Sequence, residues 1–575
     1  MGPRWFPSWV WFYLWPLIML TSRLYFLAVN LIFALYNYFQ PRKWVPEPTD
    51  RLLLISATQA AKLISQKEIT SRQLIDAYIR RIEQINPIIN AMVVNFFDDA
   101  RAEADEADRT IENLSGDEVK ELFQKKPLLG VPFTVKDAFE IEDVVVTCGV
   151  YNMKDVKSKS TAESIIRMKN AGAVLLGITN VAEASMWFES NNTIYGRTVN
   201  PYDSRRIAGG SSGGEGALIG AAGSVVSWFY PSIVLILYRN AFRWDLDQVR
   251  IFSVLLFHQR LSGFEIATTS DIGGSIRIPS FVGGIFGMKP TPNMVPLDGH
   301  IPVKRDFQGE MLRIGPMCRY AEDLPLLLKI LVGPNASKLN LDEPVVRKKL
   351  RLFYAEGLQD CPVTQSLSCE MRHALRKAVK LLEMKYDTNA TRICLPTANY
   401  ACEMFVLSME DETQSDIREW IVNPYSGQGK VDCWKELPAF MMGKSKHTLP
   451  SILQGILATI NPFTPGRHRE VINMRDRLRN QLEQLLSDDG ILLFPCWSVT
   501  APFHNETVFE PFDLGYTALW NCLRLPAISC PVGLDAKGLP LGVQLIGMPF
   551  SDRQLIAVAQ DLEEGFSGWT PARMQ

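Results

Sequence analysis

The apolar positions of this chain recur with two different spacings, one helical and one strand-like. After Thr70, apolar residues return every three or four positions, which predicts an amphipathic helix that ends at Asn86-Pro87. These residues are Leu74, Ile75, Tyr78, Ile79, Ile82 and Ile85. Short apolar runs at residues 173–177 and 490–495 predict strands. Alternation of this kind favours an α/β fold with helices on both faces of a sheet.

The N-terminal segment, residues 5–39, is almost continuously apolar and aromatic. Pro7, Pro16 and a polar step at residues 21–23 interrupt it, and neither side of that step reaches the roughly 20 apolar residues of a spanning helix. One tilted span, a hairpin and an interfacial anchor therefore all stay open. A cleavable signal peptide is disfavoured, because the run is too long and lacks a small-residue exit.

We assign residues 1–44 to a membrane anchor and residues 50–575 to a single α/β domain. The anchor ends in the basic and aromatic sequence Pro41-Arg42-Lys43-Trp44, which favours a cytosolic position for the domain that follows. The endoplasmic reticulum and lipid droplets are both plausible membranes.

A second apolar stripe of helical spacing lies in the C-terminal third of the chain. It consists of Leu449, Ile452, Leu453, Ile456, Leu457 and Ile460. An ordinary helix that faces the core explains this spacing. The alternative is a cap that contacts the membrane, since the basic residues Lys444, Lys446 and Arg467 lie at its ends.

Composition and charge exclude several classes of protein. Hydrophobic residues make up 47% of the 575 positions, enough for a large core, and the net charge of −2 offers no basic surface for nucleic acid. The ten cysteines include no C-x-x-C pair, and the sequence contains no H-E-x-x-H. We therefore expect no nucleic-acid partner, no metal, no cofactor and no disulfide scaffold.

Two glycine-rich serine loops and one lysine carry the candidate chemistry. Residues 209–217 read G-G-S-S-G-G-E-G-A and contain Ser211 and Ser212. Residues 271–279 read D-I-G-G-S-I-R-I-P around Ser275. Lys136 ends an apolar run that would bury the stem of its side chain.

A serine hydrolase without histidine needs these residue types. A serine hydroxyl requires a base within hydrogen-bond reach. A lysine can be that base once desolvation lowers its pKa far below about 10.4, and a second serine can pass the proton between the two. Glycines beside the nucleophile let backbone N–H groups point at the carbonyl oxygen and stabilise the oxyanion.

Other interpretations of the two loops remain. Residues 209–213 also fit G-x-S-x-G, the nucleophile elbow of α/β-hydrolases, which needs a later histidine partner. The candidate histidines stand in no recognisable context: His258, His300, His373, His447, His468 and His504. Neither phosphate-loop pattern occurs, and each loop alone could be a plain turn. The joint occurrence of both loops and the lysine, in this order, favours the hydrolase.

These residues resemble the amidase signature family, whose catalytic centre is a Lys–Ser–Ser triad. The resemblance covers nearly all of residues 50–575 and implies a single α/β/α domain with a mixed central sheet. It also implies that Lys136 is the base, that Ser211 is the bridging serine in a cis peptide, and that Ser275 forms the acyl-enzyme.

The same resemblance implies that the second loop forms the oxyanion hole. The backbone N–H groups would come from Ile272, Gly273, Gly274 and Ser275. We interpret Ser212, Asp271 and Arg277 as residues that order the loops and take no part in proton transfer.

Within the family, the apolar N-terminus and residues 186–190 and 315–323 look most like the branch that hydrolyses fatty-acid amides. This implies a membrane-associated serine amidase whose substrate is a lipid amide. An enzyme for small polar amides, such as an amidotransferase subunit, is the alternative with the same chemistry. The sequence leaves open whether the chain is a monomer or a homodimer.

The chain departs from the family between Val226 and Ala267, because residues 227–266 are extra. Without them, residues 223–226 and 267–271 would resemble the family's uninterrupted strand and loop. One interpretation is a genuine insertion that touches membrane or substrate. The favoured one is non-coding sequence translated in frame from a wrong gene model or a retained intron. If the block displaces the loop around Ser275, the chain would be a catalytically dead, membrane-anchored isoform.

Overall fold

The computed structural model describes residues 8–221, 266–303, 306–359, 361–410, 416–460 and 463–572. The extra block at 227–266 therefore lies outside the described residues, except for Ile266, where a strand begins. The strands are β1 (Met92–Asn95), β2 (Pro132–Lys136), β3 (Val174–Thr179), β4 (Asn191–Asn192), β5 (Gly196–Arg197), β6 (Ile266–Asp271), β7 (Phe286–Lys289), β8 (Arg313–Cys318), β9 (Arg351–Tyr354), β10 (Thr391–Arg392), β11 (Gly490–Pro495), β12 (Ala527–Leu534) and β13 (Pro540–Ile546).

The α-helices precede, connect and cover these strands. They are α1 (Ser8–Tyr38), α2 (Ala57–Ser65), α3 (Ser71–Ile89), α4 (Phe97–Glu112), α5 (Gly116–Lys125), α6 (Glu163–Asn170), α7 (Gly213–Ala221), α10 (Arg277–Gly283), α11 (Asp306–Met311), α12 (Leu324–Val332), α13 (Cys369–Tyr386), α14 (Ala401–Met409), α15 (Ile417–Trp420), α16 (Cys433–Met441), α17 (Leu449–Ile460), α18 (Pro465–Leu486), α19 (Gly515–Cys522) and α20 (Asp552–Phe566). Short 3₁₀ turns, such as η3 (Glu183–Ser185) and η8 (Glu506–Val508), complete the connections.

Eleven strands form one mixed sheet with the order β1-β3-β2-β6-β8-β7-β12-β13-β11-β9-β10. β2 pairs in parallel with β3 and β6, whereas the run from β6 through β8 and β7 to β12 is antiparallel. The predicted mixed sheet is therefore confirmed. Because β2 and β6 are neighbours, the ends of the two strands that carry Lys136 and Asp271 lie side by side.

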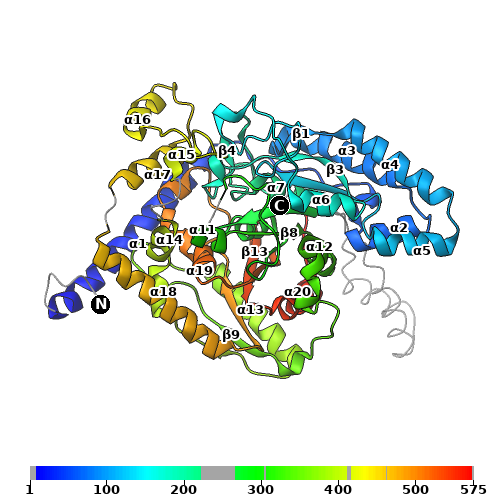
Figure 1. Cartoon of the computed structure of the whole chain (residues 1–575). Helices are drawn as coiled ribbons and strands as arrows, with labels where there is room; N and C mark the ends of the chain where they lie inside the picture. Colours follow the sequence, from blue (N-terminus) through cyan, green and yellow to red (C-terminus); the bar gives the residue numbers. More distant parts are fainter. Residues whose placement is uncertain are drawn as a thin grey trace, which may run out of the picture.

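Helices cover both faces of this sheet, as the sequence predicts. Along β11, Ile491 and Leu493 belong to one buried cluster, while Leu492 and Phe494 belong to another, as expected for successive side chains on opposite faces. In Figure 1, α14, α18 and α19 lie on one side of the strands, and α12, α13 and α20 lie on the other. The α/β/α layering is confirmed.

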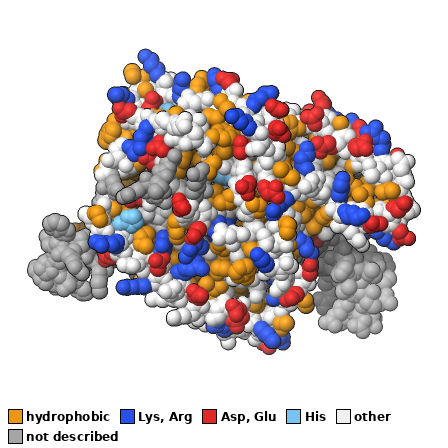
Figure 2. Space-filling view, viewed as in Figure 1, with side chains coloured by type: hydrophobic (Ala, Val, Ile, Leu, Met, Phe, Trp, Pro, Cys, Tyr) orange, Lys and Arg blue, Asp and Glu red, His pale blue; other side chains and the backbone are white. Residues whose placement is uncertain are grey.

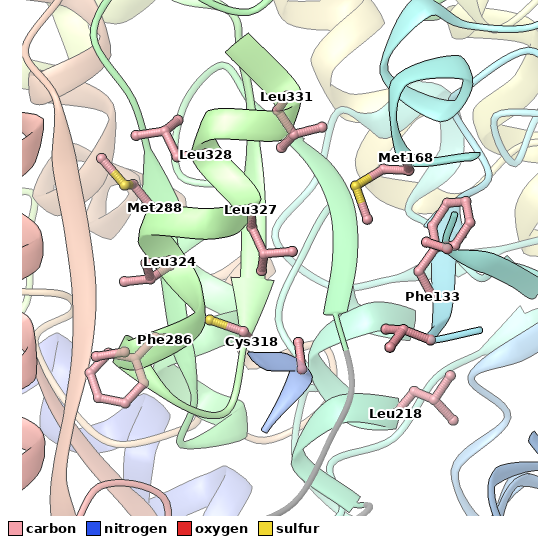
Figure 3. Close-up of a cluster of buried hydrophobic side chains, with 14 of the residues drawn as sticks. Phe133, Met168, Leu218, Phe286, Met288, Cys318, Leu324, Leu327, Leu328 and Leu331 are labelled. Atoms are coloured by element: carbon pink, nitrogen blue, oxygen red, sulfur yellow. The ribbon is translucent and has the colours of Figure 1, made fainter. Parts of the chain in front are cut away.

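A dense apolar core holds β2, the strand that ends in Lys136, between helices. Figure 3 shows Phe133 of β2 near Leu218 of α7, with Leu327 and Leu331 of α12 on the side of β8. Every residue of β2 is buried. Burial on both faces leaves the strand no contact with water, so a charged group at its end is desolvated as well.

The helix predicted after Thr70 is present as α3, but its predicted end is wrong. The helix continues past Asn86-Pro87 to Ile89, with the left-handed Asn90 as its cap. Proline costs the helix a single N–H bond near its end, and the Asn90 N–H still bonds the Asn86 carbonyl at 2.8 Å. The predicted strands correspond to β3 and β11, the latter with the predicted bounds.

The second apolar stripe forms α17, and only one face of this helix packs into the core. Ile452 and Ile456 are buried in a small cluster with Trp420 and Cys433. By contrast, Leu457 and Ile460 are 62% and 57% exposed. The interpretation as a core helix explains the first face only.

The N-terminal apolar segment is one helix, α1, so the hairpin alternative is wrong. Leu14–Tyr38 has a mean hydropathy of 1.8 and is long enough, by length and composition, to cross a membrane. In Figure 1 the blue α1 runs along the body of the protein, and its N-terminal end projects at the left. Figure 2 shows acidic and basic side chains intermixed over the visible face, in keeping with the net charge of −2.

Candidate active site

A small cavity at the ends of β2 and β6 brings together the lysine and both predicted serines. Lys136, Ser211 and Ser275 all line it. Its other lining residues are Ala184, Ser185, Met186, Ser270, Ile272, His300, Pro302 and Leu312. Residues from three distant parts of the sequence therefore meet at one hollow, as a catalytic centre requires.

Lys136 is the last residue of β2, and its side chain is fully buried. Its Nζ lies 2.7 Å from Ser211 Oγ and 3.1 Å from Ser270 Oγ. Burial lowers the pKa of Lys136 from its ordinary 10.5 to about 8. Four nearby acidic groups act in the opposite direction, namely Cys148, Asp271, Glu215 and Asp137. An appreciable fraction of this lysine is therefore neutral near pH 8 and can accept a proton.

Ser211 lies in a turn that only glycines permit. The Gly210–Ser211 peptide bond is cis, as the resemblance implies. Gly209 has φ +81°, and a Cβ there would lie 2.5 Å from Pro279 Cα. A Cβ at Gly210 would meet the Trp187 carbonyl oxygen at 2.5 Å, so both glycines are required by close packing.

The loop around Ser275 is held by a buried ion pair. Asp271 Oδ1 accepts the Gly274 N–H at 2.8 Å, and Oδ2 accepts the Ile276 N–H at 3.2 Å. Arg277 donates to both carboxylate oxygens of Asp271 at 3.0 Å, and both side chains are fully buried. Burial alone would raise the pKa of Asp271, but Arg277 lowers it to about 2, so the carboxylate is ionised. These contacts tie the loop to the end of β6.

The predicted oxyanion donors are not equivalent. The Gly274 N–H already donates to Asp271, which differs from the prediction that it faces the substrate. Within the described part of the chain, the N–H groups of Ile272, Gly273 and Ser275 have no acceptor. Three of the four predicted N–H donors therefore lack an acceptor among the described residues.

Ser212, predicted to order its loop, has a buried hydroxyl without a hydrogen-bond partner among the described residues. The loop is held instead through Gly213, whose backbone N–H donates to Ser190 Oγ at 2.8 Å. Ser190 Oγ in turn donates to the Ser211 carbonyl at 2.9 Å. The side chain that holds the first loop is therefore Ser190, which no motif singles out.

The sequence also missed Ser270 and His300. Ser270 Oγ lies between Lys136 Nζ and His300 Nε2, at 3.1 and 2.8 Å. Strand alternation could have identified Ser270, because it precedes Asp271 on β6 and so points to the opposite face. His300 was only one of six candidate histidines, and nothing in the sequence distinguished it, because it comes from a connection outside both motifs.

Glu215, in the first turn of α7, is a second buried titratable group beside the lysine. Thr134 Oγ1 donates to Glu215 Oε2 at 2.6 Å, and burial raises the pKa of this carboxyl group to about 8. A largely neutral Glu215 near pH 7 adds little negative charge next to Lys136. An ionised Glu215 would oppose the neutral form of Lys136, and its raised pKa limits this effect near pH 7.

Comparison with known proteins identifies the family. A family model described as Amidase matches residues 73–228 and 261–556, and the unmatched residues between them fall within the extra block. Fatty-acid amide hydrolase 2-A of Danio rerio is 37% identical over 555 residues, which cover 95% of this chain and 96% of that protein. Fatty-acid amide hydrolase 2 of Homo sapiens is 37% identical over 528 residues, covering 91% of each.

A solved structure of fatty acid amide hydrolase shares the fold, with a TM-score of 0.65 at 20% identity over 90% of this chain and 86% of that one. The interpretation of residues 209–213 as an α/β-hydrolase elbow is wrong, because the model that matches this region is that of the amidases. The chain belongs to the amidase signature family and is a hydrolase that acts on amides.

Proposed function

We propose that this chain is a membrane-associated serine amidase that hydrolyses fatty-acid amides to free fatty acid and amine. The observation that carries the proposal is the contact of a buried lysine with Ser211, in a cavity that Ser275 also lines. The two relatives at 37% identity, both fatty-acid amide hydrolases, support the substrate class.

In this mechanism Ser275 is the nucleophile. Neutral Lys136 takes the proton of Ser211, and Ser211 takes the proton of Ser275 as its Oγ bonds to the amide carbon. The N–H groups of Ile272, Gly273 and Ser275 receive the oxyanion. The proton then returns through Ser211 to the leaving amine as the C–N bond breaks. Water hydrolyses the acyl-enzyme by the same relay in reverse.

The contacts that hold the site argue against a catalytically dead chain. The ion pair of Asp271 with Arg277, and the bond of Thr517 Oγ1 to the Gly273 carbonyl at 2.7 Å, lie wholly among described residues. β6 also pairs with β2 over residues 266–268 and with β8 over residues 266–271. Among these contacts only the strand pairing of Ile266 involves the block at 227–266, so we propose that the loop keeps its place beside it.

A substrate panel tests the proposal. The purified chain should hydrolyse oleamide faster than acetamide or glutamine, measured as kcat/KM from released ammonia. A variant that lacks residues 227–266 should do the same at a comparable rate. Faster hydrolysis of the small amides would overturn the fatty-acid assignment in favour of the small-amide enzyme. Activity in the shortened protein alone would show that the block switches the enzyme off.

For the membrane, we propose that α1 lies on the bilayer surface and does not cross it. Polar contacts dock the helix on the catalytic domain. Ser22 Oγ donates to the Pro362 carbonyl at 2.6 Å, Gln365 Nε2 to Asn30 Oδ1 at 3.2 Å, and Arg205 to the Asn37 carbonyl at 3.0 Å. At a rise of 1.5 Å per residue, only about 21 Å of the described helix precedes Ser22. This falls short of a hydrocarbon core of about 30 Å.

The side of α1 that faces away from the domain suits an interfacial position. Leu24, Leu27, Leu31 and Leu35 recur at helical spacing and are 56% to 65% exposed. Their combined apolar area is the kind of surface that binds the boundary between headgroups and acyl chains.

Flotation with phosphatidylcholine vesicles tests this face. The triple variant Leu24→Glu, Leu27→Glu and Leu31→Glu should lose most vesicle binding and keep its turnover of a soluble amide. Met384→Glu on α13, which charges a side chain that is 70% exposed, is the matched control and should float like the parent. In sealed microsomes, tags at the two termini should be cleaved by protease from the same side. Protection of the N-terminal tag alone would instead mean that α1 spans the membrane.

A further inference from the structure

A chain of hydrogen bonds leads away from Lys136 on the side opposite Ser211. Lys136 Nζ lies 3.1 Å from Ser270 Oγ, and Ser270 Oγ lies 2.8 Å from His300 Nε2. The other ring nitrogen of His300, Nδ1, lies 3.3 Å from the Pro302 carbonyl oxygen. His300 is only 5% exposed, and its ring meets that of Phe139 edge to face at 5.4 Å. The mechanism proposed above uses neither Ser270 nor His300.

The carbonyl oxygen at one end assigns the tautomer of a neutral His300, and with it the direction of the bonds in this chain. A carbonyl oxygen can only accept, so Nδ1 of His300 carries the hydrogen that Pro302 receives. In a neutral imidazole the other nitrogen, Nε2, is then an acceptor. The hydroxyl hydrogen of Ser270 must therefore point to His300. What Ser270 presents to Lys136 is a lone pair.

This direction decides how a neutral lysine is oriented. An uncharged amine has two hydrogens and one lone pair. Because Ser270 can only accept from Lys136, a hydrogen of Nζ is directed to Ser270. The lone pair of Nζ is then free to face Ser211, 2.7 Å away, whose proton it must take. If the hydrogen of Ser270 pointed to Lys136 instead, it would occupy that lone pair and compete with Ser211.

We propose that His300 is a positioning residue for the amidase reaction: by holding the hydroxyl hydrogen of Ser270, it keeps the lone pair of Lys136 directed at Ser211. The proposal rests on the proposed function, in which Lys136 is the base. His300 does not touch the reacting atoms and acts only through Ser270 and Lys136.

The pH dependence of the reaction offers a readout that a loss of packing would not reproduce. Because Lys136 has a pKa of about 8 and acts when neutral, activity of the parent should rise with pH to a plateau, with a midpoint near pH 8. The charged or titratable groups that face Lys136 are Cys148 and Asp137 from the segment after β2, Asp271 from β6 and Glu215 from α7. All four stay in place in the variants below.

The first two variants remove the bridge at either end. In Ser270→Ala the buried ammonium form of Lys136 loses an acceptor, and in His300→Phe the freed Ser270 hydroxyl can donate to the neutral amine. Each change favours the neutral lysine, so the midpoint should move below that of the parent. The plateau of kcat should nevertheless fall about 10- to 100-fold, because the lone pair is no longer directed at Ser211. KM should change little.

Conservative variants and a double variant separate positioning from packing. Ser270→Thr and His300→Gln keep a hydroxyl and an acceptor, so both should recover most of the plateau and the parent midpoint. In the double variant, the losses should not add, because both act through the same hydroxyl. Thr269→Val is the matched control: it removes a buried hydroxyl from the adjacent strand position, whose bond goes to the Gly315 carbonyl at 3.0 Å. Its midpoint should equal that of the parent.

Two results would overturn the proposal. One is an unchanged plateau in both His300→Phe and Ser270→Ala. The other is a midpoint that moves upward together with a raised KM, which would indicate that water has entered a loosened cavity and hydrates the ammonium form.

A fluorophosphonate separates failure of this proposal from failure of the proposed function. Ser275 Oγ bonds to phosphorus, fluoride leaves, and the serine proton passes through Ser211 to Lys136, so labelling needs no amide substrate. If oleamide is not hydrolysed but Ser275 is labelled with the pH profiles described, the substrate assignment fails and the role of His300 stands. If Ser275 of the parent is not labelled at any pH, both proposals fail.

Discussion

Replacing Ser275 with alanine should reduce the hydrolysis of oleamide at least about 1000-fold, since covalent catalysis ends with the loss of its nucleophile. Ser275 lies in the loop between β6 and α10 and lines the cavity together with Lys136 and Ser211. Its side chain is only partly exposed and small, so its truncation leaves the core intact. Circular dichroism and vesicle flotation of the variant should match those of the parent.

Ser280→Ala is the matched control for this experiment. Ser280 lies on α10, five residues after Ser275, and its hydroxyl donates at 2.8 Å to the carbonyl of Ile276, the N-cap residue of that helix. It does not line the cavity. The control should keep turnover within a few-fold of the parent. When the parent enzyme is quenched during turnover, the peptide that contains Ser275 should carry an acyl group. Turnover by Ser275→Ala close to that of the parent would falsify the assignment of the nucleophile.

Local pattern was enough to predict the layers of the fold, whereas the pairing of Lys136 with Ser211 was implied by the resemblance of their motifs to the amidase signature family. Buried strands such as β11 are apolar on both faces, which is visible in six residues of sequence. Glycines beside Ser211 are required by contacts with Pro279 and Trp187, and that requirement leaves a sequence signature. Chemistry that needs particular residue types in particular turns can therefore be recognised from the order of residues alone.

Contacts between distant segments account for what the sequence did not predict. His300, in the connection after β7, contacts Ser270 of β6, and no spacing in the sequence encodes that contact. The Gly274 N–H is taken by Asp271, a side chain whose direction depends on the ion pair with Arg277. The end of α3 was misplaced because one proline in a last turn costs too little to stop a helix whose tip is capped by Asn90.

Removing Arg277 should destabilise the protein by about 3–5 kcal/mol, the largest effect on stability that we expect from a single substitution near the site. The Arg277 guanidinium and the Asp271 carboxylate are fully buried and joined by two bonds of 3.0 Å. Arg277 also donates to the Thr517 carbonyl and to Gln544 Oε1, each at 3.0 Å. Arg277→Leu would leave Asp271 as a buried carboxylate without its partner, and the midpoint of urea unfolding at pH 7 should fall accordingly.

The pH dependence of this loss has a definite sign. In the parent, the folded pKa of Asp271, about 2, lies below its ordinary value of 3.8. The stability gained from the ion pair is therefore present above about pH 4 and is lost as the pH falls towards 2. In Arg277→Leu, burial instead raises the pKa of Asp271. As the pH falls, Asp271 is therefore protonated earlier in the variant than in the parent, which removes the unpaired buried charge. The difference in unfolding midpoint between parent and variant should shrink as the pH falls from 7 to 4.

An exposed ion pair and a double variant complete the test. Arg109 lies 2.8 Å from Glu106 with both side chains about two-thirds exposed, so Arg109→Leu should cost less than about 1 kcal/mol. Asp271→Leu combined with Arg277→Leu should be more stable than Arg277→Leu alone, because no buried charge is left unpaired. It should still be inactive, since Asp271 no longer receives the Gly274 and Ile276 N–H groups that shape the loop around Ser275. Equal midpoints for Arg277→Leu and Arg109→Leu would mean that the buried pair does not hold this loop.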